Sequence, residues 1–148
     1  MSTTDFNWAR VAGHGAFEKT CLNTDASNNL ANGQIVKMDA TNVMSGTPYL
    51  TVSGVVLAGA AVFPYGVVIT PAASVSGTPP YNPLRVQYGG EVQVNASAAI
   101  TAGAILATAA SGKVATQTSG QPQVGQALTA AAASTDILQA ALAFANNA

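Results

Sequence analysis

The chain has 148 residues, of which 49% are hydrophobic and 7% are charged, and its formal net charge is −1. Average soluble domains carry roughly 25% charged residues, so the surface of this chain must be largely neutral, which is typical of a protein packed into an assembly. The five Lys and Arg residues are scattered and form no nucleic-acid footprint. We see no secretory signal, no apolar run long enough for a bilayer and no second cysteine for an internal disulfide.

Residues 1–14 show no periodic pattern and predict an extended N-terminal arm. The apolar residues of this arm are Phe6, Trp8 and Val11, and Trp8 is the only tryptophan of the chain. A tryptophan on an arm usually needs a surface that buries it. The sequence leaves open whether that surface belongs to a partner or to the chain's own domain.

From residue 15 onward, turn-forming Gly, Pro, Asn and Ser residues recur at short intervals. Between them lie short runs that are rich in Val, Ile, Thr and aromatic residues. This spacing predicts an all-β fold, either a small β-barrel or a β-sandwich. The predicted strands are 16–22, 34–39, 49–57, 65–70, 84–88, 91–95, 104–108, 113–116, 123–129 and 136–144.

The segment 130–145 allows two interpretations. It is rich in alanine, and Ile137, Leu138 and Leu142 would line one face of a helix, so propensity favours a helix. An internal repeat, described next, instead matches 136–144 to a strand in the first half. We adopt the strand, although the sequence alone does not decide between the two.

The order of elements in residues 15–88 recurs in residues 89–148. The matched positions are residues 15–18 with 89–92, Gly33 with Gly103, Gly66 with Gly125, and Leu84 with Leu138. Relative to the second half, the first carries insertions within 44–63 and 74–83. One half alone is too small to bury both faces of its sheet. We therefore predict a single β domain over 15–148, built from two related halves.

The inventory of reactive residues argues against an enzyme. The only histidine, His14, lies between two glycines, and Cys21 is expected to be a small buried hydrophobe. The carboxylates are widely spaced, and no glycine-rich phosphate-binding loop is present. We expect no catalytic residue, no metal and no cofactor. The carboxylates are Asp5, Glu18, Asp25, Asp39, Glu91 and Asp136.

The second predicted insertion ends in a loop with several prolines and a tyrosine. Proline fixes φ, so such a loop loses little entropy when it forms a contact. An ordinary insertion loop would look the same. Together with the arm, this loop supplies the candidate residues for contact with a partner protein or for self-association, namely Phe6, Trp8, Val11, Pro79, Pro80, Tyr81 and Pro83.

The last third of the chain resembles a known family. Residues 100–114 (ITAGAILATAASGKV) and 123–138 (QVGQALTAAAASTDIL) are similar to two adjacent blocks of tailed-bacteriophage capsid decoration, or head cement, proteins. The resemblance covers residues 91–142 directly. It implies a structural virion protein that is made in the host cytoplasm. Such a protein binds the major capsid protein on the outer capsid surface, often as a trimer, and stabilises the lattice.

Two other functions stay open. Another virion component, such as a tail or minor head protein, would fit the composition equally well. A carbohydrate-binding β-sandwich would need an exposed aromatic cluster, whereas the nine aromatic residues of this chain are dispersed along the sequence. We expect no nucleic acid and no membrane among the partners.

Overall fold

The computed structural model describes residues 17–41, 52–76 and 80–146. Within these ranges the chain forms ten β-strands and one short 3-10 helix, and no α-helix. The prediction of an all-β fold is therefore confirmed. The predicted arm, residues 1–14, lies outside the described ranges.

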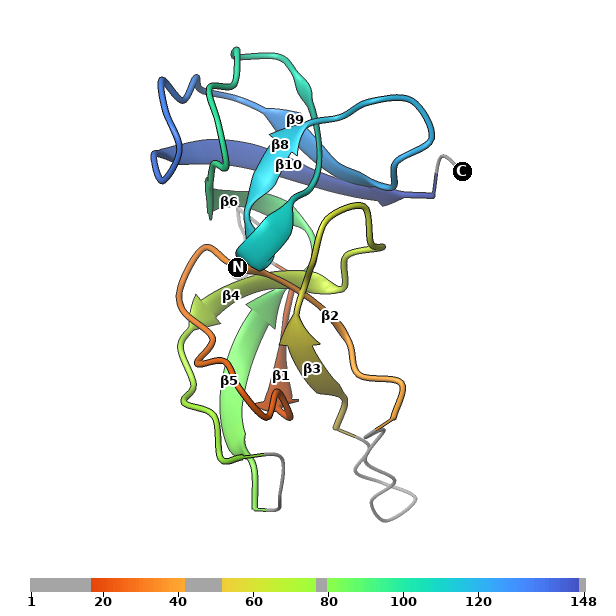
Figure 1. The fold of residues 1–148 in the computed structure, drawn as a ribbon, viewed down its shortest axis with the longest axis vertical. Helices are drawn as coiled ribbons and strands as arrows, with labels where there is room; N and C mark the ends of the chain where they lie inside the picture. Colours follow the sequence, from red (N-terminus) through yellow and green to blue (C-terminus); the bar gives the residue numbers. More distant parts are fainter. Residues whose placement is uncertain (1–16, 42–51, 77–79, 147–148) are drawn as a thin grey trace, which may run out of the picture.

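The first half is a closed five-stranded barrel, drawn from red to light green in Figure 1. The strands follow one another around it in the order β1-β3-β2-β4-β5, and β5 pairs with β1 again. Only the β1–β3 pair is parallel. The strands are β1 (Glu18–Asn23), β2 (Ile35–Met38), β3 (Gly54–Leu57), β4 (Gly66–Thr70) and β5 (Asn82–Gln87).

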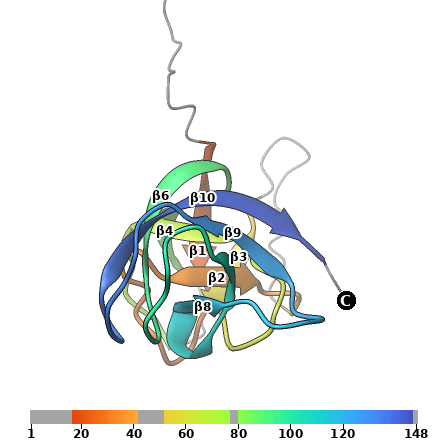
Figure 2. The same ribbon diagram turned by 90° about the horizontal axis from the view of Figure 1, so that it is seen from above.

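The second half is a five-stranded sheet in the order β6-β10-β9-β7-β8, which lies above the barrel in Figure 1 and curves around its own axis in Figure 2. A parallel bridge between Ala96 and Val114 joins the two ends of this sheet. The strands are β6 (Gly90–Asn95), β7 (Ile105–Thr108), β8 (Val114–Thr116), β9 (Gln123–Ala127) and β10 (Ile137–Ala145), and the 3-10 helix η2 (Ala110–Gly112) lies between β7 and β8.

Both halves pair their strands in the same way, with β6 to β10 taking the places of β1 to β5. Smaller features recur as well, because Gly33 N–H donates to Val68 O at 2.9 Å and Gly103 N–H donates to Ala127 O at 2.7 Å. The longer connection in the first half is residues 39–53, between β2 and β3, where the second half needs only 109–113. The second half therefore has the same strand topology as the first.

Every predicted strand has a counterpart in the structure, with ends that differ by a few residues. Residues 49–51 of the third prediction lie outside the described ranges. Cys21 pairs with Leu84, and Val94 pairs with Leu138, which corresponds to Leu84 in the repeat. Cys21 therefore corresponds to Val94. The predicted match of 15–18 with 89–92 would align Cys21 with Asn95 instead, so it is wrong by one residue. The adjacent Gly89 and Gly90 made the one-residue shift invisible in the sequence.

The choice of a strand for 136–144 is confirmed by β10. This strand pairs with β6 on one side and β9 on the other, and it buries Leu138 and Ala140. Two ladders of backbone hydrogen bonds and burial in the core outweigh the helix propensity of alanine, which amounts to only tenths of a kcal/mol per residue.

The apolar core runs across the junction of the halves. Ile35, Ala58 and Val67 of the first half pack in one cluster with the interior residues of the second half. Hydrogen bonds reinforce this junction: the buried Thr108 Oγ1 donates to Val62 O at 2.8 Å and accepts from Val62 N–H at 2.9 Å. A second cluster fills the barrel itself. The two halves therefore share part of one core.

Two matched glycines allow close approach between strands. A Cβ added at Gly66 would overlap the Val86 side chain, and one added at Gly125 would overlap the carbonyl oxygen of Ala141. Both glycines pair with neighbouring strands, where any side chain would push those strands apart. The repeat therefore retains glycine at both positions for the same steric reason.

We expect Gly125→Ala to lower the free energy of unfolding by about 1–3 kcal/mol, because the new methyl group meets backbone rather than a movable side chain. Gly59→Ala is the matched control, since nothing lies within 4 Å of a Cβ at Gly59. The urea midpoint should fall for Gly125→Ala and stay close to the original for Gly59→Ala. Equal midpoints for both variants would contradict this close approach of β9 to β10.

Candidate functional site

In the described part of the chain, no three His, Cys, Asp or Glu residues lie close enough to hold a metal ion. None of the helices found there has the length and apolar character needed to cross a membrane. Cys21 is fully buried and unpaired, as predicted, and burial raises the pKa of its thiol. Because the thiolate is the reactive form, burial and the raised pKa make this thiol a poor nucleophile.

The carboxylate of Asp25 organises a loop. It accepts hydrogen bonds from the backbone N–H groups of Ser27, Asn28 and Leu57, each at 3.0 Å. Partial burial opposes ionisation, but these hydrogen bonds outweigh it and lower the pKa of Asp25 below its ordinary value of 3.8. Asp25 thereby ties the loop that follows β1 to the end of β3.

Three aromatic residues that are dispersed in the sequence meet at one end of the β1–β5 pair. The rings of Phe17 and Tyr88 lie 5.8 Å apart, and Lys19 Nζ lies over the rings of Tyr65 and Tyr88 at 4.6 and 5.2 Å. Lys19 Nζ also donates to Tyr65 Oη at 2.7 Å, and Tyr65 Oη donates to Ser53 Oγ at 3.0 Å. We call Phe17, Lys19, Tyr65 and Tyr88 the aromatic cluster.

The aromatic cluster is a surface feature. Phe17 is 57% exposed and Tyr88 is 42% exposed. The Tyr65 hydroxyl raises the pKa of the Lys19 ammonium through their hydrogen bond, so Lys19 stays charged. The sequence could not reveal this cluster, because only the pairing of β1 with β5 and of β5 with β4 brings these residues together.

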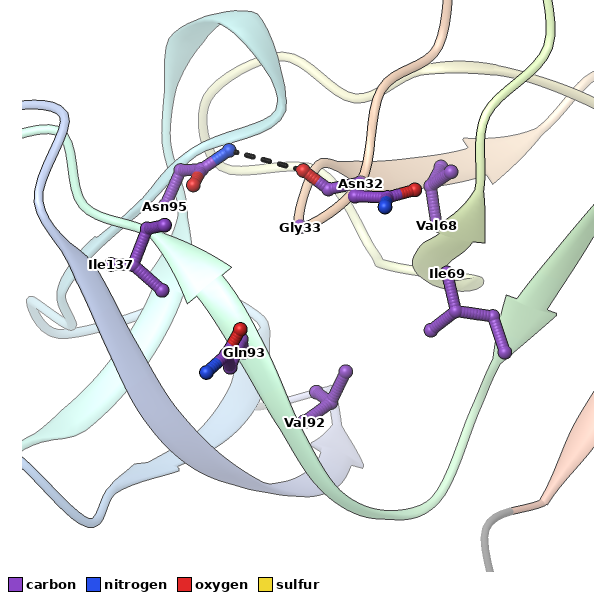
Figure 3. Close-up of a pocket in the computed structure, with 8 residues that line it drawn as sticks. All are labelled: Asn32, Gly33, Val68, Ile69, Val92, Gln93, Asn95 and Ile137. Atoms are coloured by element: carbon purple, nitrogen blue, oxygen red, sulfur yellow. Dashed lines mark hydrogen bonds between the residues drawn. The ribbon is translucent and has the colours of Figure 1, made fainter.

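A hollow of about 250 Å³ lies between the two halves, and we call it the inter-half groove. Its lining combines aliphatic side chains with side-chain amides and contains no charged residue (Figure 3). Ile137 stands at its edge with 61% of its surface exposed. The lining residues are Asn32, Gly33, Val68 and Ile69 from the first half, and Val92, Gln93, Asn95 and Ile137 from the second.

The outer side of the second half is almost uncharged. Residues 90–146 contain only Glu91, Lys113 and Asp136 as charged residues. On β6, β10 and β9, Gln93 pairs with Gln139, and Gln126 pairs with Ala141. Paired residues and alternate residues share one side of a sheet, so Gln93, Gln126, Gln139 and Ala141 form one outward face, the glutamine face. The exposed Glu91, which pairs with Ala141, adds one charge to this face.

Three of the predicted contact residues are described, and they lie away from the aromatic cluster. Pro80 and Pro83 are exposed and Tyr81 is half-buried, at the start of β5. We call residues 80–83 the proline loop. Tyr88 follows the other end of β5, so the proline loop and the aromatic cluster lie at opposite ends of that strand. The remaining predicted contacts, Phe6, Trp8, Val11 and Pro79, lie outside the described residues.

No protein-family model matches the chain, and no curated protein matches it either. Among solved structures, the fold is similar to the N base of the head fiber gp8.5 in bacteriophage phi29, with a TM-score of 0.61 and 15% sequence identity. The similarity covers 85% of this chain and 92% of that chain. At this level of identity it establishes a common fold, with both halves included.

We expect Asp25→Asn to lower the free energy of unfolding by about 1–3 kcal/mol at pH 7, because the loop loses a charged acceptor. In the original chain this stabilisation should begin to fall below pH 3.8. It should be lost as the pH passes through the lowered pKa of Asp25, since protonation removes the charge. The gap in urea midpoint between the two proteins should therefore narrow in acid. Glu91→Gln, at an exposed carboxylate, is the control. A gap that is constant with pH would contradict the role of the Asp25 charge.

Proposed function

We propose that this chain is a non-catalytic structural protein of a tailed-phage virion. It binds the outside of the head and stabilises the lattice of the major capsid protein. The observation that carries the proposal is the similarity in fold to the N base of a phage head fiber, over nearly the whole of both chains. The resemblance of residues 100–114 and 123–138 to decoration proteins points the same way.

The glutamine face suits such a role. Side-chain amides both donate and accept hydrogen bonds, so they pair with polar groups of another protein without the large desolvation penalty of a buried charge. Depletion of charge is also what distinguishes the core of protein interfaces from other surface. We therefore propose that the glutamine face contacts the capsid.

The proline loop is the second proposed contact. Pro80 and Pro83 restrict the backbone on either side of Tyr81, so the loop keeps its shape when it binds. The arm residues Phe6, Trp8 and Val11 remain predictions. We also propose a homo-oligomer, with a trimer favoured by the family resemblance. Because the barrel is closed, copies would associate through faces and loops rather than through strand edges.

Phage heads assembled without this chain provide the direct test. We expect saturable binding to expanded heads, weaker binding to unexpanded proheads, and expanded heads that withstand more heat or denaturant once they are occupied. Immunogold labelling of complete particles should place the chain on the head. Labelling of the tail alone would favour the alternative virion role, and no binding to either particle would contradict the proposal.

Contact through the glutamine face has a separate test. Gln139→Glu should weaken head binding by at least about tenfold, because it buries an unpaired charge. Thr20→Glu adds the same charge to the exposed outer side of β1 and should leave binding unchanged. Binding of the original chain should change little between about 0.1 M and 1 M salt, since few ion pairs are available for screening. A loss of binding in high salt would indicate an ionic interface instead.

The aromatic cluster favours a second candidate function, the binding of carbohydrate. Exposed rings can stack on the apolar faces of sugars, and the structure gathers three rings that the sequence disperses. If a glycan screen gives a hit, Tyr88→Ala should abolish it, whereas Leu128→Ala, at an exposed apolar residue of the second half, should not. A hit that survives Tyr88→Ala would exclude this surface.

A further inference from the structure

The inter-half groove has the size and chemistry of a site for one large side chain. Its volume of about 250 Å³ is below the 300–1,000 Å³ that is usual for small-molecule sites. Val68 and Val92 form an apolar floor, and Ile137 adds an exposed apolar edge. The amides of Asn32, Gln93 and Asn95 offer carbonyl oxygens around it (Figure 3). A ring with one N–H group fits that combination.

The segment that precedes β1 joins the described fold close to this groove. Phe17 O accepts a hydrogen bond from Tyr88 N–H at 2.8 Å, and Val92 of the groove follows Tyr88 by four residues. Phe17 therefore lies within roughly 17 Å of the groove, because an extended residue spans at most about 3.6 Å. Trp8 precedes Phe17 by nine residues, a span of up to about 30 Å, so its side chain can reach the groove.

We propose that Trp8 docks into the inter-half groove of its own chain. The indole ring would pack on Val68, Val92 and Ile137, and its N–H group would donate to a side-chain carbonyl oxygen of Gln93 or Asn95. A buried indole needs both of these contacts. Tethering favours the groove of the same chain, since a short linker gives an effective concentration in the millimolar range. This inference goes beyond the proposed function and does not depend on it, and it assigns Trp8 to its own chain rather than to the predicted capsid contacts.

Trp8 is the only tryptophan, so its fluorescence reports the docking directly. In the folded original chain, we expect blue-shifted emission and slow quenching by acrylamide. Ile137→Glu places a charge at the groove and should shift the emission to the red and raise the quenching constant severalfold. Leu128→Glu, at another exposed apolar residue, should leave both unchanged. Circular dichroism and the urea midpoint would verify that each variant is folded.

A mixture of two variants distinguishes docking of Trp8 into its own chain from docking into a neighbouring copy. Trp8→Phe keeps the groove but carries no tryptophan, whereas Ile137→Glu keeps Trp8 but blocks its own groove. After the two are refolded together, Trp8 should remain as exposed as in Ile137→Glu alone. Recovered protection would mean that Trp8 enters a second copy, and would overturn the assignment to the same chain. Quenching in the original chain equal to that of a free peptide of residues 1–16 would overturn the docking altogether.

Discussion

The rest of the structure depends on the apolar core that crosses the junction of the two halves. Ile35 and Val67 belong to barrel strands, but their side chains pack with the interior residues of the second sheet. A domain of about 60 residues buries a smaller share of its surface than a larger one and is only marginally stable. The shared cluster adds buried apolar surface to both halves. The inter-half groove lies along this same junction, and its shape therefore depends on how the halves pack.

The strands were predictable because their signals are local. Alternation of apolar residues, turn-forming pairs and the recurrence of Gly66 and Gly125 in matching contexts are all properties of short segments. Even β10 was recognised as a strand, although its alanines favour a helix, because the repeat gave it a partner in the first half. The one-residue error at the start of the repeat arose where two adjacent glycines offer no side chain that would fix the register.

The surfaces were not predictable, because they combine residues that are far apart in the chain. Lys19 and Tyr88 meet only because β1 pairs with β5, and Gly33 and Gln93 line one groove only because the halves stack. In the sequence, Lys19 and Tyr88 are isolated residues, Gly33 belongs to a common type of turn, and Gln93 is one polar residue of an alternating strand. Their chemistry follows from pairing partners, which single-sequence patterns do not specify. The proline loop, by contrast, is contiguous and could be recognised directly.

The two halves share one topology but carry different surfaces. The described first half holds most of the charged residues, the Asp25 loop and the aromatic cluster, whereas the second half holds three charges and the glutamine face. Since the pairing of strands is the same, this difference cannot come from the requirements of the fold. Charged residues keep a surface solvated and separate from other proteins, and neutral amides allow it to pack. The difference therefore reflects what each surface does, and it is why the proposed contact face is placed on the second half, with the proline loop of the barrel as the second proposed contact.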